Sequence, residues 1–188
     1  MLKSVKQFTL AITAAAFLFP ASLAVADTSD QVAVKKEGIV LTERVEKAAR
    51  VIQNEADRLN VMRDNSHITK RTHQHHLRKI ANQVNEELKP SLERLAEIQP
   101  DLPQWKQHAI DEMRSTAVEL AANTNAAILN RNAAAQYVPA RLDADYRQLL
   151  QSMAAQSEKL TQVADATADY AEAQLQGVDA GLAISQHN

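Results

Sequence analysis

The 188-residue sequence contains no cysteine and very little glycine, proline or aromatic character. Without a thiol, the chain cannot form disulfides, thiolate metal sites, a covalent c-type haem or a lipidated N-terminal cysteine, and it has no cysteine nucleophile. Only 3 glycines, 5 prolines and 4% aromatic residues occur, whereas alanine is abundant. Alanine favours long helices, and scarce glycine and proline leave few breaks between them. The composition therefore predicts one all-α domain.

The motifs of common enzyme classes are also missing. The chain has no G-x-S-x-G nucleophile elbow, no H-E-x-x-H zinc motif and no glycine-rich phosphate loop. It lacks the Glu-x-x-His spacing that di-iron proteins place on two helices of a bundle. A formal net charge of −2 gives no basic excess for nucleic acid. We therefore expect a protein that is not an enzyme and binds no nucleic acid.

The N-terminus has the three-part pattern of a secretory signal. Lys3 and Lys6 precede an uncharged apolar run, Phe8–Phe19, and Ala24-Val25-Ala26 is a small-x-small cleavage site. This pattern predicts a signal peptide over residues 1–26 and a periplasmic or secreted protein. An uncleaved anchor over residues 8–26 is the alternative, because that segment is nearly long enough to span a bilayer. Cleavage would leave 19 basic and 23 acidic side chains, and no later segment that could cross a membrane.

The clearest periodic pattern lies between Leu142 and Tyr170. Its members follow one another at alternating spacings of four and three residues, which places one stripe along a single helix face. A helix of about thirty residues is about 45 Å long, and one narrow stripe is stable only when partner helices cover it. The stripe consists of Leu142, Tyr146, Leu149, Met153, Gln156, Leu160, Val163, Thr167 and Tyr170.

The same spacing predicts three more long helices. Short connections make neighbouring helices antiparallel, so we expect an up-down-up-down four-helix bundle over residues 39–173, with coiled-coil-like packing. Residues 27–38 should form a flexible leader, ended by Gly38. Residues 174–188 should form a flexible tail with a weak apolar patch at Leu175, Val178, Leu182 and Ile184. The predicted helices cover residues 39–64 (or 42–64), 67–98, 102–130 and 139–173.

Prolines modify this simple pattern at two places. Pro90 lies inside the second helix, where it lacks an N–H and clashes with the carbonyl of Glu86 at a cost of about 3 kcal/mol. Because the periodicity continues past it, we expect a kink at Pro90, with a clean break as the alternative. Pro100-Asp101-Leu102-Pro103 is the clearest turn, and Asp101 should cap the third helix.

A His-rich stretch from His67 to Lys79 is the most unusual feature. It holds four of the 6 histidines and four basic residues, and no acidic residue occurs between Asp64 and Glu86. Its charge increases as the pH falls through about 6.5, the ordinary pKa of histidine. The stretch therefore predicts a basic binding patch at one end of the bundle. The patch residues are His67, Lys70, Arg71, His73, His75, His76, Arg78 and Lys79.

His73 and His76 offer a second interpretation, a transition-metal site. They lie three residues apart on one helix face, so their imidazoles could clamp one Zn²⁺, Cu²⁺ or Ni²⁺ ion. In the expected bundle, acidic residues from other helices could approach them, namely Asp64, Asp143 and Asp145. The neighbouring cations would repel a metal, and no thiolate is present. No other cofactor is expected.

Two polar or aromatic positions on the third helix also have alternative interpretations. A buried Asn123 or Thr124 would fix the register of neighbouring helices, or else line a polar pocket at the His-rich end. Trp105 would fill the core, with ligand stacking as a lesser alternative.

These observations lead to three functional hypotheses. The first is an exported binding protein of the cell envelope, which meets an acidic protein partner or an envelope anion through the basic patch. The second is periplasmic metal binding or sensing through His73 and His76. The third is a self-associating structural bundle, a homo-oligomer held together by the apolar tail.

Overall fold

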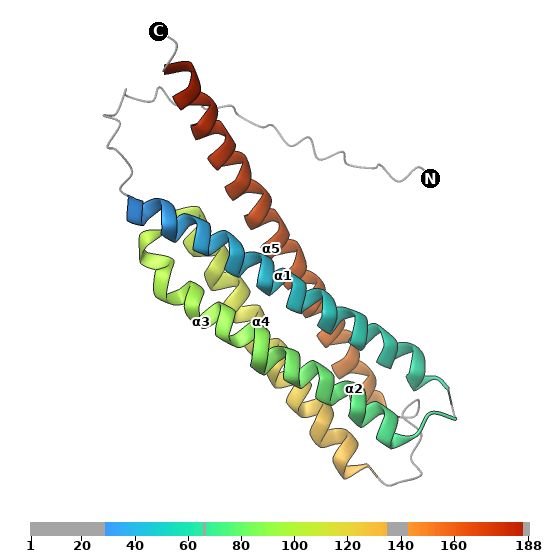
Figure 1. Ribbon diagram of the computed structural model, residues 1–188. Coiled ribbons are helices and arrows are strands. Elements are labelled where there is room, and N and C mark those ends of the chain that lie inside the picture. The colour runs from blue at the N-terminus through green and yellow to red at the C-terminus, as the bar shows by residue number, and fades with distance from the viewer. Residues whose placement is uncertain (1–28, 66, 135–142, 186–188) are drawn as a thin grey trace, which may run out of the picture.

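The computed structural model describes residues 29–65, 67–134 and 143–185, and it describes side chains between residues 31 and 173 of these ranges. It confirms the predicted all-α bundle: helices pack against one another, and the described residues contain no strand (Figure 1). Helices α2, η1 and α3 follow one another without interruption and form a single rod. The elements are α1 (Ser29–Arg63), α2 (Lys70–Gln83), η1 (Val84–Leu88), α3 (Lys89–Ile98), η2 (Gln99–Asp101), α4 (Gln104–Ala133) and α5 (Ala144–Ser185).

Both ends of the bundle are more helical than the sequence indicated. The expected flexible leader needs correction, because α1 begins at Ser29, and α5 continues through most of the expected tail. The break expected at Gly38 is also wrong. Gly38 is buried inside α1, and a Cβ at this position would lie 3.3 Å from Lys106 Nζ of α4. The glycine therefore permits close approach to α4. The expected signal peptide over residues 1–26 lies outside the described residues.

A π-helical turn, η1, ends at Leu88, two residues before Pro90. At its end the N–H of Lys89 donates to the carbonyl oxygen of Val84, five residues earlier. A regular α-helix would bring the proline ring against the carbonyl of Glu86. The wider turn offers a way to avoid this conflict without ending the rod. The alternative of a clean break is therefore wrong, whereas a bend at Pro90 stays a prediction.

The N-terminus of α4 is capped differently from the prediction. Asp101 ends η2, and Pro103 occupies the position before α4 without any side-chain cap. The carbonyl oxygen of Pro103 accepts the N–H groups of Lys106 and Gln107, at 2.9 and 3.1 Å. Asp101 lies in the 3₁₀ turn η2, two residues before the N-cap position of α4, and therefore does not cap this helix.

One apolar core runs along the bundle. The predicted stripes of the first two helices are almost entirely buried, from Val45 to Leu59 on α1 and from Leu77 to Ile98 on the second rod. On α5 the predicted stripe is buried at Tyr146, Met153, Leu160 and Thr167, but Leu150 beside it is also buried and Tyr170 is 50% exposed. On α4 the buried face includes Ile110, which the spacing did not select. On helices this rich in alanine, several stripes fit the spacing, so periodicity selects the face poorly.

Small hydroxyl residues line much of the remaining interface. Each donates its hydroxyl to the carbonyl oxygen four residues earlier, so that no polar atom of the group is buried without a partner. Short side chains of this kind let helices pack closely. The residues with such bonds are Thr42, Thr116, Thr124, Ser157, Thr161 and Thr167.

Asn123 and Trp105 join α4 to α5. Asn123 Nδ2 donates to Gln156 Oε1 at 3.0 Å, a bond that only one register of the two helices allows. The half-buried Trp105 packs edge-on against Tyr170, with ring centroids 4.5 Å apart.

Long-range contacts gather four segments at one end of the molecule. Lys70 at the start of α2 bonds to the end of α4, and His73 bonds to Tyr146 near the start of α5. Glu55, two turns before the end of α1, pairs with His76. We call this the His-rich end; it comprises residues 55–63, 70–79, 130–134 and 143–147.

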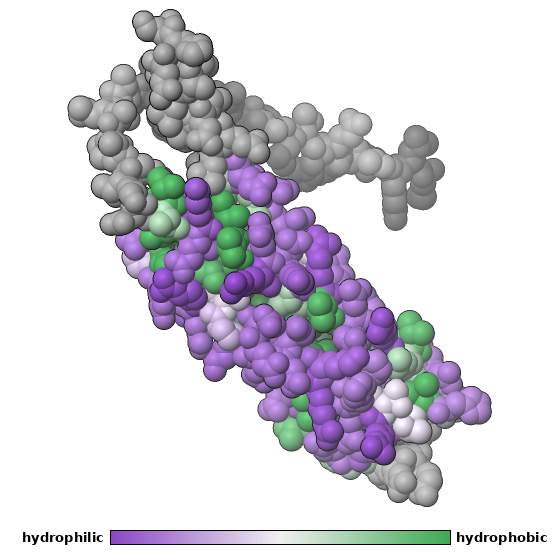
Figure 2. All heavy atoms as spheres, viewed as in Figure 1, coloured by the Kyte–Doolittle hydropathy of each residue, from purple (hydrophilic) through white to green (hydrophobic). Residues whose placement is uncertain are grey.

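The surface is mostly polar. On the face viewed in Figure 2 the hydrophobic areas are small and separate. None of the helices in residues 29–65, 67–134 and 143–185 carries an apolar stretch long enough to traverse a bilayer.

Two substitutions on α1 test the position of the core. Leu59 is fully buried, so Leu59→Ala should lower the free energy of unfolding by about 2–5 kcal/mol through lost contacts and a cavity. Val61 is 77% exposed, so Val61→Ala should change it by less than about 0.5 kcal/mol. Urea unfolding followed by circular dichroism measures both. Equal effects would contradict the described packing of α1.

Candidate functional site

Helix geometry divides the His-rich stretch into an inner and an outer set. Thr69 caps α2 by accepting the N–H of Thr72 at 3.3 Å, and α2 begins at Lys70. From there each residue turns by about 100°, so His73 and His76 fall on the buried face with Leu77 and Ile80. The remaining ionisable members are exposed, apart from the half-buried Lys70: His67, Arg71, His75, Arg78 and Lys79.

The inner His73 bonds to a tyrosine of α5. Its Nδ1 lies 3.1 Å from the hydroxyl oxygen of Tyr146, and both residues are buried. Burial, with the nearby charges of Arg131 and His76, lowers the pKa of His73 to about 4. Burial also raises the pKa of Tyr146. At neutral pH a protonated hydroxyl therefore faces a neutral imidazole, and Tyr146 can donate the bond.

The inner His76 bonds to a carboxylate of α1. Its Nδ1 donates to Glu55, a residue only 8% exposed. Burial acts to raise the pKa of Glu55, but the His76 bond and the charges of Lys79 and Arg58 outweigh it, so the net shift is downward. Lys79 Nζ and Arg58 Nη1 lie 3.7 and 3.5 Å from Glu55 Oε1. The ionised carboxylate of Glu55 thus contacts three basic side chains.

A buried arginine completes this polar cluster. The Arg131 side chain of α4 is 2% exposed, and its Nη2 forms an ion pair with Asp143. Its guanidinium also lies over the ring of Tyr146, 4.3 Å from the centroid. Asp143 in turn caps α5 by accepting the N–H of Tyr146 at 2.9 Å. Burial acts to raise the pKa of Asp143, but the hydrogen bonds that its carboxylate accepts and the charge of Arg131 outweigh this effect, so the net shift is downward.

We call these six side chains the buried network: Glu55, His73, His76, Arg131, Asp143 and Tyr146. They form two hydrogen-bonded groups, Glu55 with His76, and His73 with Tyr146, Arg131 and Asp143. Because His73 and His76 stand on the same face of α2, the two groups together join all four rods at the His-rich end. The polar groups of the network bond to one another, and each of the two imidazoles is oriented by a hydrogen bond at Nδ1.

The sequence placed His73 and His76 together, offered Asp143 as a neighbour and put Tyr146 on an apolar stripe, but it missed Glu55 and Arg131. His73 and His76 do share a buried face. Of the three acidic residues considered as their partners, Asp143 bonds to Arg131 and Tyr146 and to neither histidine. Asp64 pairs with Arg63, and Asp145 is exposed.

The missed members had weak signals. Glu55 interrupts the apolar stripe of α1, and Arg131 is the basic residue in the last turn of α4. Charged residues at such positions are ordinarily solvated, so only the fold reveals that they are buried.

A metal site at His73 and His76 would have to use Nε2, because Nδ1 is engaged in both rings. Residues that fix a metal-binding histidine through its second nitrogen are common behind metal ions. Within the described ranges, however, no group of three or more His, Asp or Glu side chains is arranged to hold a metal ion. Metal binding therefore stays a prediction.

The outer set forms an exposed basic ridge. We use this name for Arg71, His75 and Arg78, which share the outward face of α2. In the described parts of the chain, neither Arg71 nor Arg78 pairs with a carboxylate. Lys70 does not join the ridge, because its Nζ donates to the carbonyl oxygens of Asn132 and Ala134 at the end of α4, at 3.0 and 2.7 Å.

Comparisons with known proteins give no guide to the site. No protein-family model, no curated protein and no solved structure matches this chain. Function must therefore be argued from the side chains themselves.

His73 should make the stability of the fold depend on pH in a defined window. In the unfolded chain His73 binds a proton below about pH 6.5, whereas in the folded chain it does so only near pH 4. The unfolding free energy therefore decreases as the pH falls through this range. His73→Gln should flatten this decline in urea unfolding between pH 7.5 and 4.5. The exposed His75→Gln serves as the control and should keep the original slope. An unchanged slope in His73→Gln would refute the assignment.

Asp143 should be far more important than its neighbour Asp145. Asp143→Ala leaves Arg131 as an unpaired buried charge and removes the cap of α5, so it should cost about 3–5 kcal/mol of unfolding free energy. The exposed Asp145→Ala should cost less than about 1 kcal/mol, through its position near the helix N-terminus. Guanidinium unfolding of both variants compares them. Similar costs would mean that the ion pair with Arg131 contributes little.

Proposed function

We propose that this protein is an exported, non-enzymatic binding protein of the cell envelope that docks an acidic protein segment onto the exposed basic ridge. The observation that carries the proposal is the division of the His-rich stretch. The inner histidines are occupied by the buried network, whereas Arg71 and Arg78 point outward without a carboxylate partner among the described residues. The ridge has a rigid base, because its helix is fixed to α1, α4 and α5.

Local charge supports the proposal more than net charge does. The whole chain has a formal net charge of −2, yet residues 65–85 contain no acidic side chain. Exposed guanidinium groups bind carboxylates in a fork geometry, so an acidic surface is the natural partner of this segment. Attraction between exposed charges is screened over about 10 Å at 0.1 M salt, which makes binding sensitive to ionic strength.

Poly-glutamate binding tests this function. Arg71→Ala with Arg78→Ala should weaken binding at about 50 mM salt by about three- to tenfold, as expected for two exposed ion pairs. Binding by the unaltered protein should be lost at about 0.5 M salt. Fluorescence anisotropy with labelled poly-glutamate measures both effects.

A charge-matched variant supplies the control for this experiment. Lys36→Ala with Arg114→Ala removes the same charge from exposed positions outside the His-rich end and should bind like the original protein. Equal weakening in both double variants would show a net-charge effect and refute the ridge. Binding to vesicles with anionic lipid, without binding to poly-glutamate, would favour an envelope anion over a protein partner.

A further inference from the structure

A hollow lies between α4 and α5, in the half of the bundle away from the His-rich end. Its volume is about 580 Å³, which is within the usual range of small-molecule sites. The rings of Trp105 and Tyr170 line one end, and Glu112 stands about two helical turns away at the other end. Small apolar side chains of α5, Val163 and Ala166, form the floor between them. We call this site the aromatic hollow.

Aromatic side chains are scarce in this chain, yet two of them meet at this surface. All three phenylalanines precede residue 20, and the rest of the chain has one tryptophan and three tyrosines. Trp105 and Tyr170 pack with ring centroids 4.5 Å apart and ring planes at 80°, and Tyr170 is 50% exposed. Two rings at this angle form a corner, and the faces of aromatic rings attract cations.

The charge around the aromatic hollow is mainly negative. The segments that form it, residues 105–112 and 162–173, contain five acidic side chains and one lysine. This lysine, Lys106, is 3% exposed, and its Nζ lies beside Gly38 of α1. Lys159 and Arg50 pair with two of the five acidic side chains from outside these segments, which still leaves an acidic excess. The hollow should therefore favour a cation over an anion.

The hydrogen-bonding groups of the hollow are already engaged, and this selects the kind of cation. Glu112 pairs with Lys159 at 2.9 Å, and the side chains of Gln162 and Thr167 both donate to oxygens within α5. A primary ammonium group is strongly hydrated and needs several acceptors in place of its water. A quaternary ammonium group has no N–H to satisfy, and its methyl groups can contact the apolar floor.

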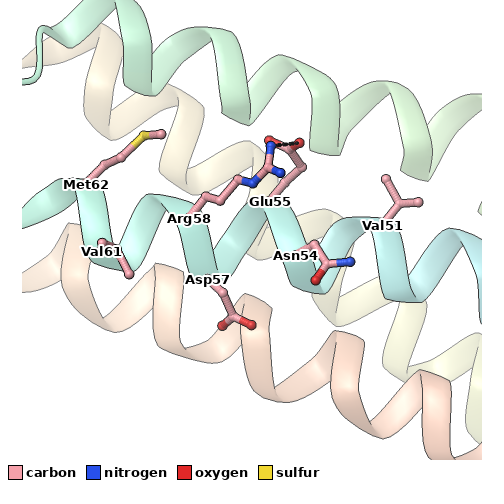
Figure 3. A pocket seen from close by; sticks show the side chains of 7 residues that line it. All are labelled: Val51, Asn54, Glu55, Asp57, Arg58, Val61 and Met62. Carbon is pink, nitrogen blue, oxygen red and sulfur yellow. Dashed lines mark hydrogen bonds and ion pairs between the residues drawn. The ribbon is translucent and has the colours of Figure 1, made fainter.

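A larger hollow along α1 lacks these features. It has a volume of about 660 Å³, and residues of α1 alone line it (Figure 3). Its charged side chains have both signs, since Glu55 and Asp57 stand beside Arg58, and the described residues that line it include no aromatic ring. This second hollow therefore favours no class of ligand.

We infer that the aromatic hollow binds a small molecule that carries a quaternary ammonium group. The positive charge would lie against the rings of Trp105 and Tyr170, and the methyl groups would cover Val163 and Ala166. This site goes beyond the proposed function, because it lies away from the basic ridge and takes a ligand of the opposite charge.

Fluorescence provides a direct test, because Trp105 is the only tryptophan of the chain. Choline is the probe, 3,3-dimethylbutanol has the same shape without the charge, and ethanolamine has the charge without the methyl groups. At constant ionic strength and pH 7, choline should give a saturable change and bind about two- to fivefold more tightly than either comparison compound. Equal binding of choline and 3,3-dimethylbutanol, or no saturable change with choline, would overturn the inference.

Substitutions at the two ends of the hollow locate the site. Tyr170→Leu should weaken choline binding about two- to fivefold, whereas Tyr170→Phe keeps a ring and should bind like the original protein. Lys159→Gln should strengthen it about twofold, because it frees the carboxylate of Glu112. Lys89→Gln is the matched control, since it breaks a comparable exposed pair with Glu93 and should change nothing. Equal effects of the two lysine substitutions, or no effect of Tyr170→Leu, would place the ligand elsewhere.

Two further comparisons separate the alternatives. Binding to phosphatidylcholine vesicles without a response to free choline would make the ligand a lipid surface and overturn the inference. Arg71→Ala with Arg78→Ala should leave choline binding unchanged. Loss of poly-glutamate binding alone would therefore remove the ridge and keep the hollow, whereas loss of the choline response alone would do the reverse.

Discussion

The buried guanidinium of Arg131 imposes the strongest constraint on this bundle. An arginine taken out of water is tolerated only when a charge and hydrogen-bond acceptors surround it. Here Asp143 supplies the charge, Asn130 Oδ1 accepts a bond from Nε at 3.0 Å, and the Tyr146 ring covers one face. Since Asp143 also caps α5, the arginine fixes where that helix starts and how it meets α4. Through Tyr146 the same constraint reaches His73 and thus α2.

This arrangement explains why a polar cluster sits inside an otherwise apolar core. Apolar contacts are not directional, so they tolerate sliding and rotation of one helix against another more readily than hydrogen bonds do. Two hydrogen-bonded groups that each need particular partners restrict both motions. Glu55 with His76 and Tyr146 with His73 attach α2 to α1 and α5, and they hold the first turns of α2 at a defined angle. The basic ridge is a surface of this fixed corner.

The sequence alone was a good guide to the fold and a partial guide to the site. Composition and periodicity indicated an all-α bundle and the buried stripes of α1 and of the second rod, because helical burial depends on spacing that is written in the chain. Spacing also placed His73 beside His76. It did not reveal that α1 starts at Ser29, because Gly38 suggested a break that the packing against α4 does not require. It also did not reveal that Ile110 is buried, since alanine-rich segments satisfy several registers equally well.

Tertiary structure alone decided which charged residues face inward. In the sequence, Arg131, Asp143 and Glu55 resemble ordinary surface charges, and His75 resembles His76. Their difference arises because a residue advances 100° around the helix, so neighbours in the chain meet water on one side and another helix on the other. The sequence therefore determined the helices and the apolar faces of α1 and of the second rod. The packing of four rods determined the pKa of His73 and the ion pair of Arg131, because each depends on residues of other segments of the chain.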